Sequence, residues 1–232
     1  ALLEQHQALM QWSHTKATVV SGELRMLCQS NEVITETLVP WMAEFTAQYP
    51  ELTLSLDVKE SLINIRDDDY DVFWSVGDYL GDRYPGLKRR SIWKTRYGVF
   101  ASPAYLKAHG TPNHPDQLAE HKVIGYLYNQ PSNVLVLQDS NGEHIYATPH
   151  CQIKTVAGIV ELAEAGLGLI NAPVESGHIQ RLLQQDKLAS VLQDYWWQDA
   201  EVYAYYHPST PTQAKVRVFL DFFLAKREEW QF

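Results

Sequence analysis

Cysteine, basic charge and long apolar runs are all scarce in this chain. Its two cysteines, Cys28 and Cys151, lack the paired spacing of a zinc site and are too few for a disulfide framework, which fits a reducing cytoplasm. No apolar run approaches the roughly 18 residues that span a bilayer, and no positively flanked apolar segment indicates export. We therefore expect a cytoplasmic protein that makes no contact with a membrane.

The charge balance disfavours nucleic-acid binding by this part of a protein. Nineteen Lys and Arg residues are scattered among 28 Asp and Glu residues, and the net charge is -9. A DNA-binding surface needs clustered Lys and Arg to neutralise phosphates. Any contact with DNA is therefore expected to come from another domain.

Strand and helix patterns alternate along the chain, which is typical of an α/β fold. Residues 24–28 and 52–58 predict strands, and residues 32–48 predict an amphipathic helix bent at Pro40. A hairpin turn is expected at residues 141–142. Further strands are predicted at residues 71–77, 87–101 (one strand or a pair), 121–126, 134–138, 144–146 and 201–206. Further helices are predicted at residues 62–70, from residue 103, and at 156–165, 179–185 and 216–223.

Motifs that would indicate a cofactor, a metal or catalysis do not reach their required patterns. The glycines of residues 166–168 follow a helix instead of opening one, so they do not form a dinucleotide fingerprint. The acidic run at residues 67–71 lacks the alternation of a calcium loop, and the histidines at 109, 114 and 121 are not spaced for zinc. No Gly-x-Ser-x-Gly elbow occurs. We expect no cofactor, no metal and no enzyme activity.

The order of these signals resembles the effector-binding domain of LysR-type transcriptional regulators, from Gly22 to Leu224. Examples are Ala-Ser-Pro-Ala-Tyr-Leu at residues 101–106 and Ala-Gly-Leu-Gly-Leu at residues 165–169. Each marker is weak alone, but seven occur in order and at compatible spacings. The markers lie at residues 22–25, 38–40 with 45–52, 70–72, 101–112, 118–121, 165–169 and 216–222.

The resemblance implies an α/β fold of two Rossmann-like lobes, as in type II periplasmic binding proteins, joined by crossing strands. Residues 22–101 and 203–232 would form the first lobe, and residues 102–202 the second. Residues 1–21 would be the end of a linker helix and its connector. The family's N-terminal winged helix-turn-helix is absent from this chain. A homodimer or tetramer is implied, and the off-face position of Val33 and Trp41 on the helix at 32–48 suggests a surface that a partner covers.

The candidate effector site lies where strands end between the two lobes. Ser30, Asn31, Ser102 and Thr155 each precede a predicted helix, where a polar side chain usually serves only as a cap. Open α/β folds bind ligands at the carboxyl ends of their strands, and helix N-termini favour anions. We therefore expect a small carboxylate or other anion in a cleft with Ser102 at the lobe junction. The predicted lining is Ser30, Asn31, Trp74 as an aromatic wall, Ser75, Ser102, Thr155, and Ala172 and Pro173 at the rear.

Two functions fit this prediction. The first is the effector-sensing domain of a LysR-type DNA-binding transcription regulator, in which the ligand changes the oligomer arrangement. The second is a periplasmic-type solute-binding protein for a small anionic metabolite, which has the same lobes. The sequence upstream would separate them, because a helix-turn-helix supports the first and a secretory signal the second.

Overall fold

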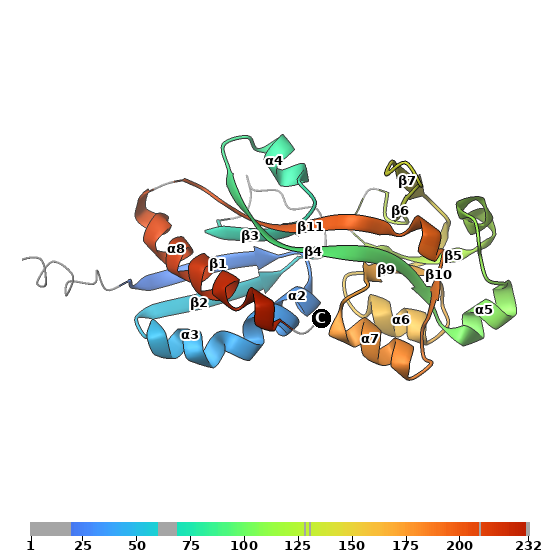
Figure 1. Ribbon diagram of the computed structural model, residues 1–232, viewed down its shortest axis with the longest axis horizontal. Helices are drawn as coiled ribbons and strands as arrows, with labels where there is room; N and C mark the ends of the chain where they lie inside the picture. Colours follow the sequence, from blue (N-terminus) through green and yellow to red (C-terminus); the bar gives the residue numbers. More distant parts are fainter. Residues whose placement is uncertain (1–19, 60–68, 128, 130, 209, 231–232) are drawn as a thin grey trace, which may run out of the picture.

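The computed structural model describes residues 20–59, 69–127, 129, 131–208 and 210–230. It shows two α/β lobes joined by two long antiparallel strands, β4 (Lys88–Ala101) and β11 (Trp197–Tyr206) (Figure 1). The predicted α/β, two-lobe fold class is confirmed. The expected linker helix at residues 1–21 and the short helix at 62–70 lie mostly outside the described residues. The stretch predicted as one strand or a pair is the single strand β4.

The first lobe is built on a sheet in which β1 lies between two parallel partners. Its strand order is β2-β1-β3-β11-β4, with β11 antiparallel to β3. Its other elements are β1 (Gly22–Cys28), β2 (Leu52–Val58), β3 (Val72–Val76), α4 (Tyr79–Arg83), α8 (Thr210–Ala225) and η5 (Arg227–Glu229).

The helical segment after β1, which contains Pro40, changes its hydrogen-bond pattern three times. It runs through α2 (Asn31–Val33), the π-helix η1 (Ile34–Leu38), the 3-10 turn η2 (Val39–Trp41) and α3 (Met42–Gln48). Proline lacks a backbone N–H, so the regular α pattern is interrupted at this point, as expected for a bend.

The two residues predicted to lie on a surface that a partner covers, Val33 and Trp41, are not exposed in the structure. Val33 is buried in the core of the first lobe, and Trp41 is half-buried with its ring 4.5 Å from the Lys226 ammonium. Val39 is the exposed apolar residue of this segment, at 54%. The prediction is therefore wrong for Val33, because its side chain already packs in the core of its own lobe.

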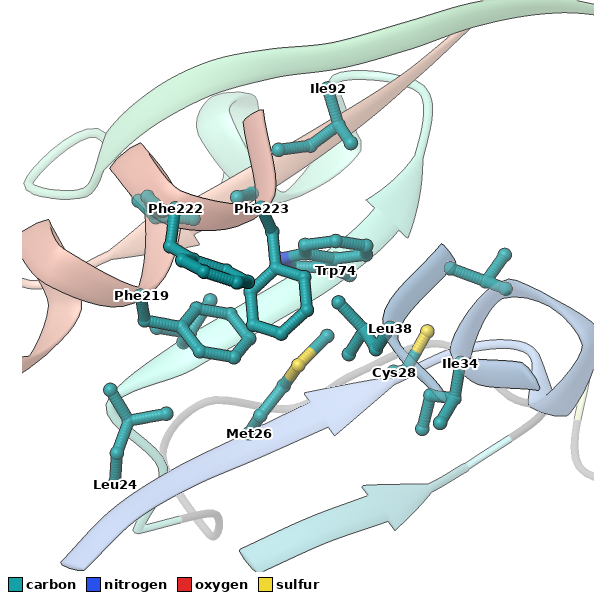
Figure 2. Packing of buried hydrophobic residues seen from close by; sticks show 14 of the residues in the cluster. Leu24, Met26, Cys28, Ile34, Leu38, Trp74, Ile92, Phe219, Phe222 and Phe223 are labelled. Atoms are coloured by element: carbon teal, nitrogen blue, oxygen red, sulfur yellow. The ribbon is translucent and has the colours of Figure 1, made fainter. Parts of the chain in front are cut away.

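Alternate residues of β1 anchor the core of the first lobe. Leu24, Met26 and Cys28 point to the face that α8 and the segment from α2 to α3 cover (Figure 2). Aromatic rings from α3 and α8 fill the space above them, with the rings of Phe45 and Phe223 5.3 Å apart. This packing fixes the position of the carboxyl end of β1.

The second lobe combines a parallel strand pair, a hairpin and several short helices. The hairpin predicted at residues 141–142 is confirmed, since it joins β6 to β7. The parallel pair is β5 with β8, and β9 and β10 pair with the far half of β4. The elements are α5 (Pro103–His109), η3 (Pro115–Glu120), β5 (Lys122–Tyr126), β6 (Leu135–Gln138), β7 (His144–Ala147), β8 (His150–Thr155), α6 (Ile159–Glu164), β9 (Ile170–Pro173), α7 (Gly177–Gln184), β10 (Ala189–Val191) and η4 (Gln193–Tyr195).

The chain passes between the lobes inside the two long strands. β4 pairs with β11 from Lys88 to Tyr97, and with β9 and β10 from Tyr97 to Ala101. Phe100 packs in the core of the second lobe. The passage therefore lies near Tyr97 in β4, and in β11 it lies between Trp197, which pairs with Tyr97, and Val202, which packs in the first lobe. The predicted boundaries at residues 101 and 202 lie up to a few residues from these points, because a strand shared by both lobes has no loop to mark the border.

Acid sensitivity of the second lobe is expected from His121. Its side chain is buried, with Nδ1 3.3 Å from the Tyr105 hydroxyl. Burial, and then the nearby His109, lower the pKa of His121 below its usual value. The unfolded chain therefore takes up this proton first, so stability falls as pH drops below about 6.5, down to the folded pKa. In thermal melts across this pH range, the melting temperature should fall less with decreasing pH in His121→Gln than in the wild type. The control variant His150→Gln, which replaces an exposed histidine, should behave like the wild type. If the melting temperature of His121→Gln fell with pH as steeply as that of the wild type, this assignment would be contradicted.

Candidate functional site

The carboxyl end of β1 faces the second lobe and carries the polar run Gln29-Ser30-Asn31. The Gln29 N–H donates to the Trp74 carbonyl at 3.1 Å, which ties this end to β3. Ser30 Oγ accepts from the Val33 N–H at 3.5 Å, so the predicted cap at Ser30 is confirmed. Ser30 is half-buried and Asn31 is exposed. Figure 1 places α2 on the side of the first lobe that faces the second.

Thr155 ends β8 in the second lobe, but it does not cap a helix. Its hydroxyl accepts from the Ala157 N–H at 3.0 Å and so closes a local turn. The helix α6 begins only at Ile159, and its N-cap is Gly158 with a φ of 72°. This left-handed conformation favours glycine. The predicted cap at Thr155 is therefore wrong, because a glycine turn separates the strand from the helix.

Trp74 lies in the core of the first lobe and does not form an aromatic wall between the lobes. It is 1% exposed, and its ring packs at 6.1 Å from Trp93 and 6.4 Å from Phe219 (Figure 2). Ser75 follows on the opposite face of β3, paired with Tyr203 of β11. Its hydroxyl is buried and has no hydrogen-bond partner within the described part of the chain. The structure therefore removes Trp74 from the candidate site, whereas Ser75 stays a prediction.

Three further residues of the predicted lining, Ser102, Ala172 and Pro173, differ in how close they lie to the lobe junction. Ser102 Oγ accepts from the Tyr105 N–H at 3.2 Å, which confirms it as the cap of α5. Figure 1 places α5, the helix that Ser102 caps, at the outer end of the second lobe, so Ser102 is not at the lobe junction as predicted. Ala172 is buried in the core of the second lobe. Pro173 is half-buried and pairs with Tyr97, where β4 passes between the lobes, so it is the residue of the three that borders the junction.

A carboxylate of the first lobe binds directly to a helix of the second. Glu36 Oε1 accepts from the Ser176 hydroxyl at 3.1 Å and from the His178 N–H at 3.2 Å. Ser176 is the N-cap of α7, where free N–H groups favour an anion. No sequence pattern predicts this contact, because 140 residues separate Glu36 from Ser176 and neither lies in a recognisable motif.

A second carboxylate stiffens the passage between the lobes. Glu175 accepts from the Thr95 hydroxyl at 2.8 Å and from the Arg96 N–H at 3.0 Å. It also forms an ion pair with the Arg96 guanidinium at 2.6 Å. Burial alone would raise the pKa of Glu175, but the bonds from Arg96 and Thr95 outweigh it and hold the pKa below its usual value. The ionised carboxylate therefore fastens the segment after β9 to β4.

Neither a metal-binding group nor a membrane-spanning helix occurs among the described residues. They hold no group of three or more His, Cys, Asp or Glu side chains arranged for a metal ion. In the same ranges, no helix has the length and apolar character required to cross a membrane.

Comparison with known proteins gives consistent matches over most of the chain. Residues 17–228 match the family model described as the LysR substrate binding domain. The HTH-type transcriptional regulator CrgA of Neisseria meningitidis serogroup B is 28% identical over 191 residues, covering 82% of this chain and 62% of CrgA. The HTH-type transcriptional regulator DmlR of Escherichia coli is 27% identical over 197 residues, 81% of this chain and 60% of DmlR. The chain thus spans less than two thirds of these curated relatives.

Solved structures show the same arrangement. The regulatory domain of CrgA from Neisseria meningitidis has a TM-score of 0.70 at 25% identity, covering 89% of this chain and 99% of that domain. The full-length virulence activator AphB of Vibrio cholerae has a TM-score of 0.68 at 25% identity, with coverages of 97% and 75%. These matches favour a regulatory domain over a solute-binding protein.

Proposed function

Because the chain belongs to the LysR substrate-binding domain family, we propose that it is the effector-sensing part of a cytoplasmic transcription regulator. A small molecule binds between its lobes, and the chain itself catalyses nothing. The observation that supports this proposal is that β4 and β11 run through both lobes and so define one junction between them. We propose that two polar strand ends, Ser30 of β1 and Thr155 of β8, face this junction. Open α/β sheets bind ligands at such strand ends.

The ligand we propose is a small carboxylate or other anion. Ser30 caps the N-terminus of α2 and Asn31 is its first residue, and the partial positive charge of backbone N–H groups favours negative ligands. Thr155 of the opposite lobe would donate its hydroxyl to the ligand in place of the Ala157 carbonyl to which it now donates, and Pro173 borders the junction. Ser75 would contribute its unpaired hydroxyl, a group that is costly to leave buried without a partner.

Regulation would follow from the lobe arrangement. A ligand shifts a conformational equilibrium only by its difference in affinity for the two states. We propose that closure around the ligand changes the packing of a homodimer or tetramer and so moves a DNA-binding domain. That domain would belong to the part of the protein outside this chain, because the curated relatives are named as HTH-type regulators and this chain spans about 62% of CrgA.

A thermal-shift screen of metabolites tests the proposal, followed by calorimetry on the ligand that it returns. A ligand that binds only the folded state raises the melting temperature. Thr155→Val keeps the side-chain shape and removes the hydroxyl, so affinity should fall about ten- to a hundred-fold. Thr155→Ser keeps the hydroxyl and its turn to Ala157, and should bind like the wild type. Equal affinities for wild type and Thr155→Val would remove Thr155 from the site.

Duplex DNA should not bind to this chain measurably at physiological salt. The net charge is -9, and nonspecific DNA binding depends on several Lys or Arg contacts to phosphates. A gel-shift titration is the measurement. A dissociation constant below about 1 μM would place a DNA-binding surface within this chain and contradict the proposal that another domain binds DNA.

A further inference from the structure

A hollow of about 430 Å³ lies on the first lobe where β4, β11 and α8 meet. Two of its lining residues, Lys88 at the start of β4 and Tyr206 at the end of β11, pair with each other nine residues away from Tyr97 and Trp197, where these strands pass between the lobes. Its volume falls within the range of small-molecule sites. The residues that matter for its chemistry are Lys88, Arg90, Tyr206, Arg217, Leu220 and Asp221.

Positive charge is concentrated in this hollow although the chain as a whole is acidic. Three cations line it, namely Lys88, Arg90 and Arg217, with one carboxylate, Asp221. Arg90 Nη1 lies 2.6 Å from Asp221 Oδ1, and Arg217 Nε lies 3.6 Å from Asp221 Oδ2. Lys88 has no ion pair within the residues that the structure describes. Three positive charges less one negative charge leave the lining with +2.

The arrangement of the two guanidinium groups adds geometry to this charge. Asp221 engages both, which holds Arg90 of β4 and Arg217 of α8 on the same side of the hollow. Each guanidinium has five N–H donors, so most donors stay available after one carboxylate has bound. Leu220, which is 1% exposed, fixes α8 against the sheet below them. Arginine groups held in this way suit the tetrahedral oxygens of phosphate.

We propose that this hollow binds the phosphate group of a small phosphorylated metabolite, at a site separate from the junction between the lobes. A phosphate monoester carries about -1.5 to -2 charges near neutral pH, which matches the surplus of +2. The Lys88 ammonium supplies a point charge, Arg90 and Arg217 supply paired donors, and Tyr206 belongs to the same lining.

Titration calorimetry on the whole chain, with inorganic phosphate and then glycerol 3-phosphate as probes, tests this site. Lys88→Gln and Arg217→Gln should each weaken binding about three- to tenfold, since exposed charge pairs are worth little in water. Asp221→Asn should strengthen binding about threefold or more, because the amide oxygen can still accept from the two guanidinium groups while the competing negative charge is removed. Arg217 is highly exposed, so its replacement leaves the fold intact. Tighter binding of the ester than of free phosphate would identify a phosphorylated metabolite as the source.

Two control variants make the same charge changes elsewhere on the first lobe. Arg83→Gln and Asp82→Asn, both exposed in α4, should leave the affinity within about twofold of wild type, because water and salt screen distant charges. The proposal fails if these controls match the hollow variants, or if phosphate binds no more tightly than about 1 mM. It also fails if Thr155→Val abolishes phosphate binding, since the phosphate would then lie between the lobes.

Discussion

Phe45→Ala is expected to remove about 3–5 kcal/mol from the free energy of unfolding, the largest stability effect of any single change considered for this chain. Phe45 is fully buried in α3. Its ring centroid lies 5.8 Å from that of Phe219 and 5.1 Å from that of Phe222, both in edge-on geometry. Alanine loses the burial of the ring, leaves a cavity and removes aromatic pairs that add stability beyond their area.

Chemical denaturation followed by tryptophan fluorescence measures this loss. The matched control is Thr46→Ala, the next residue of α3, whose exposed side chain bonds only to carbonyls of its own helix. This surface change should stay within about 0.5 kcal/mol of wild type. A loss below about 1 kcal/mol for Phe45→Ala would show that the contact between α3 and α8 does not hold the first lobe together.

Glu36→Ala is expected to speed hydrogen exchange at the first amides of α7 by about ten- to a hundred-fold. Glu36 gives the Ser176 hydroxyl and the His178 N–H a charged acceptor, at 3.1 and 3.2 Å. Hydrogen bonds to charged groups contribute about 1.5–3 kcal/mol, which corresponds to that factor. Removing the carboxylate opens a contact between the lobes and leaves the N-terminus of α7 without its anion.

Exchange mass spectrometry resolves this segment, and two variants bracket the effect. Glu36→Gln retains an amide oxygen but no charge, so its exchange rate should fall between those of wild type and Glu36→Ala. Glu161→Ala removes an exposed carboxylate from α6 of the second lobe and should leave α7 unchanged. Identical exchange in Glu36→Ala and wild type would mean that this contact does not restrain the lobes.

The regular parts of the fold were accessible from sequence because local patterns determine them. An apolar run marked β1, apolar alternation marked β2, and the Asn141-Gly142 turn marked the hairpin of β6 and β7. The changes of helix type around Pro40 were not accessible, since a proline predicts an interruption but not whether a π or a 3-10 turn will absorb it. The boundaries between the lobes were also displaced, because no loop marks the border inside β4.

The candidate site could be predicted from the sequence only in part. Ser30 was identified because a cap follows from sequence order. Trp74 was misplaced because β3 is buried on both faces, so its sequence does not tell which side chains pack in the core beneath α8 and which lie on the opposite face of the sheet. Thr155 was taken for a cap because a strand followed by a helix leaves the glycine turn at Gly158 unspecified. Contacts such as Glu36 with Ser176 depend on how the two lobes are placed, which no local pattern encodes.

A crystal structure of this chain with the ligand returned by the thermal-shift screen tests binding between the lobes most directly. We predict ligand density in contact with both lobes, bonded to Ser30 or Asn31 on one side and to Thr155 on the other. Pro173 should lie behind it, and Trp74 should stay in the core of the first lobe. A ligand bound wholly outside the junction, touching only one lobe, would contradict the proposed effector site.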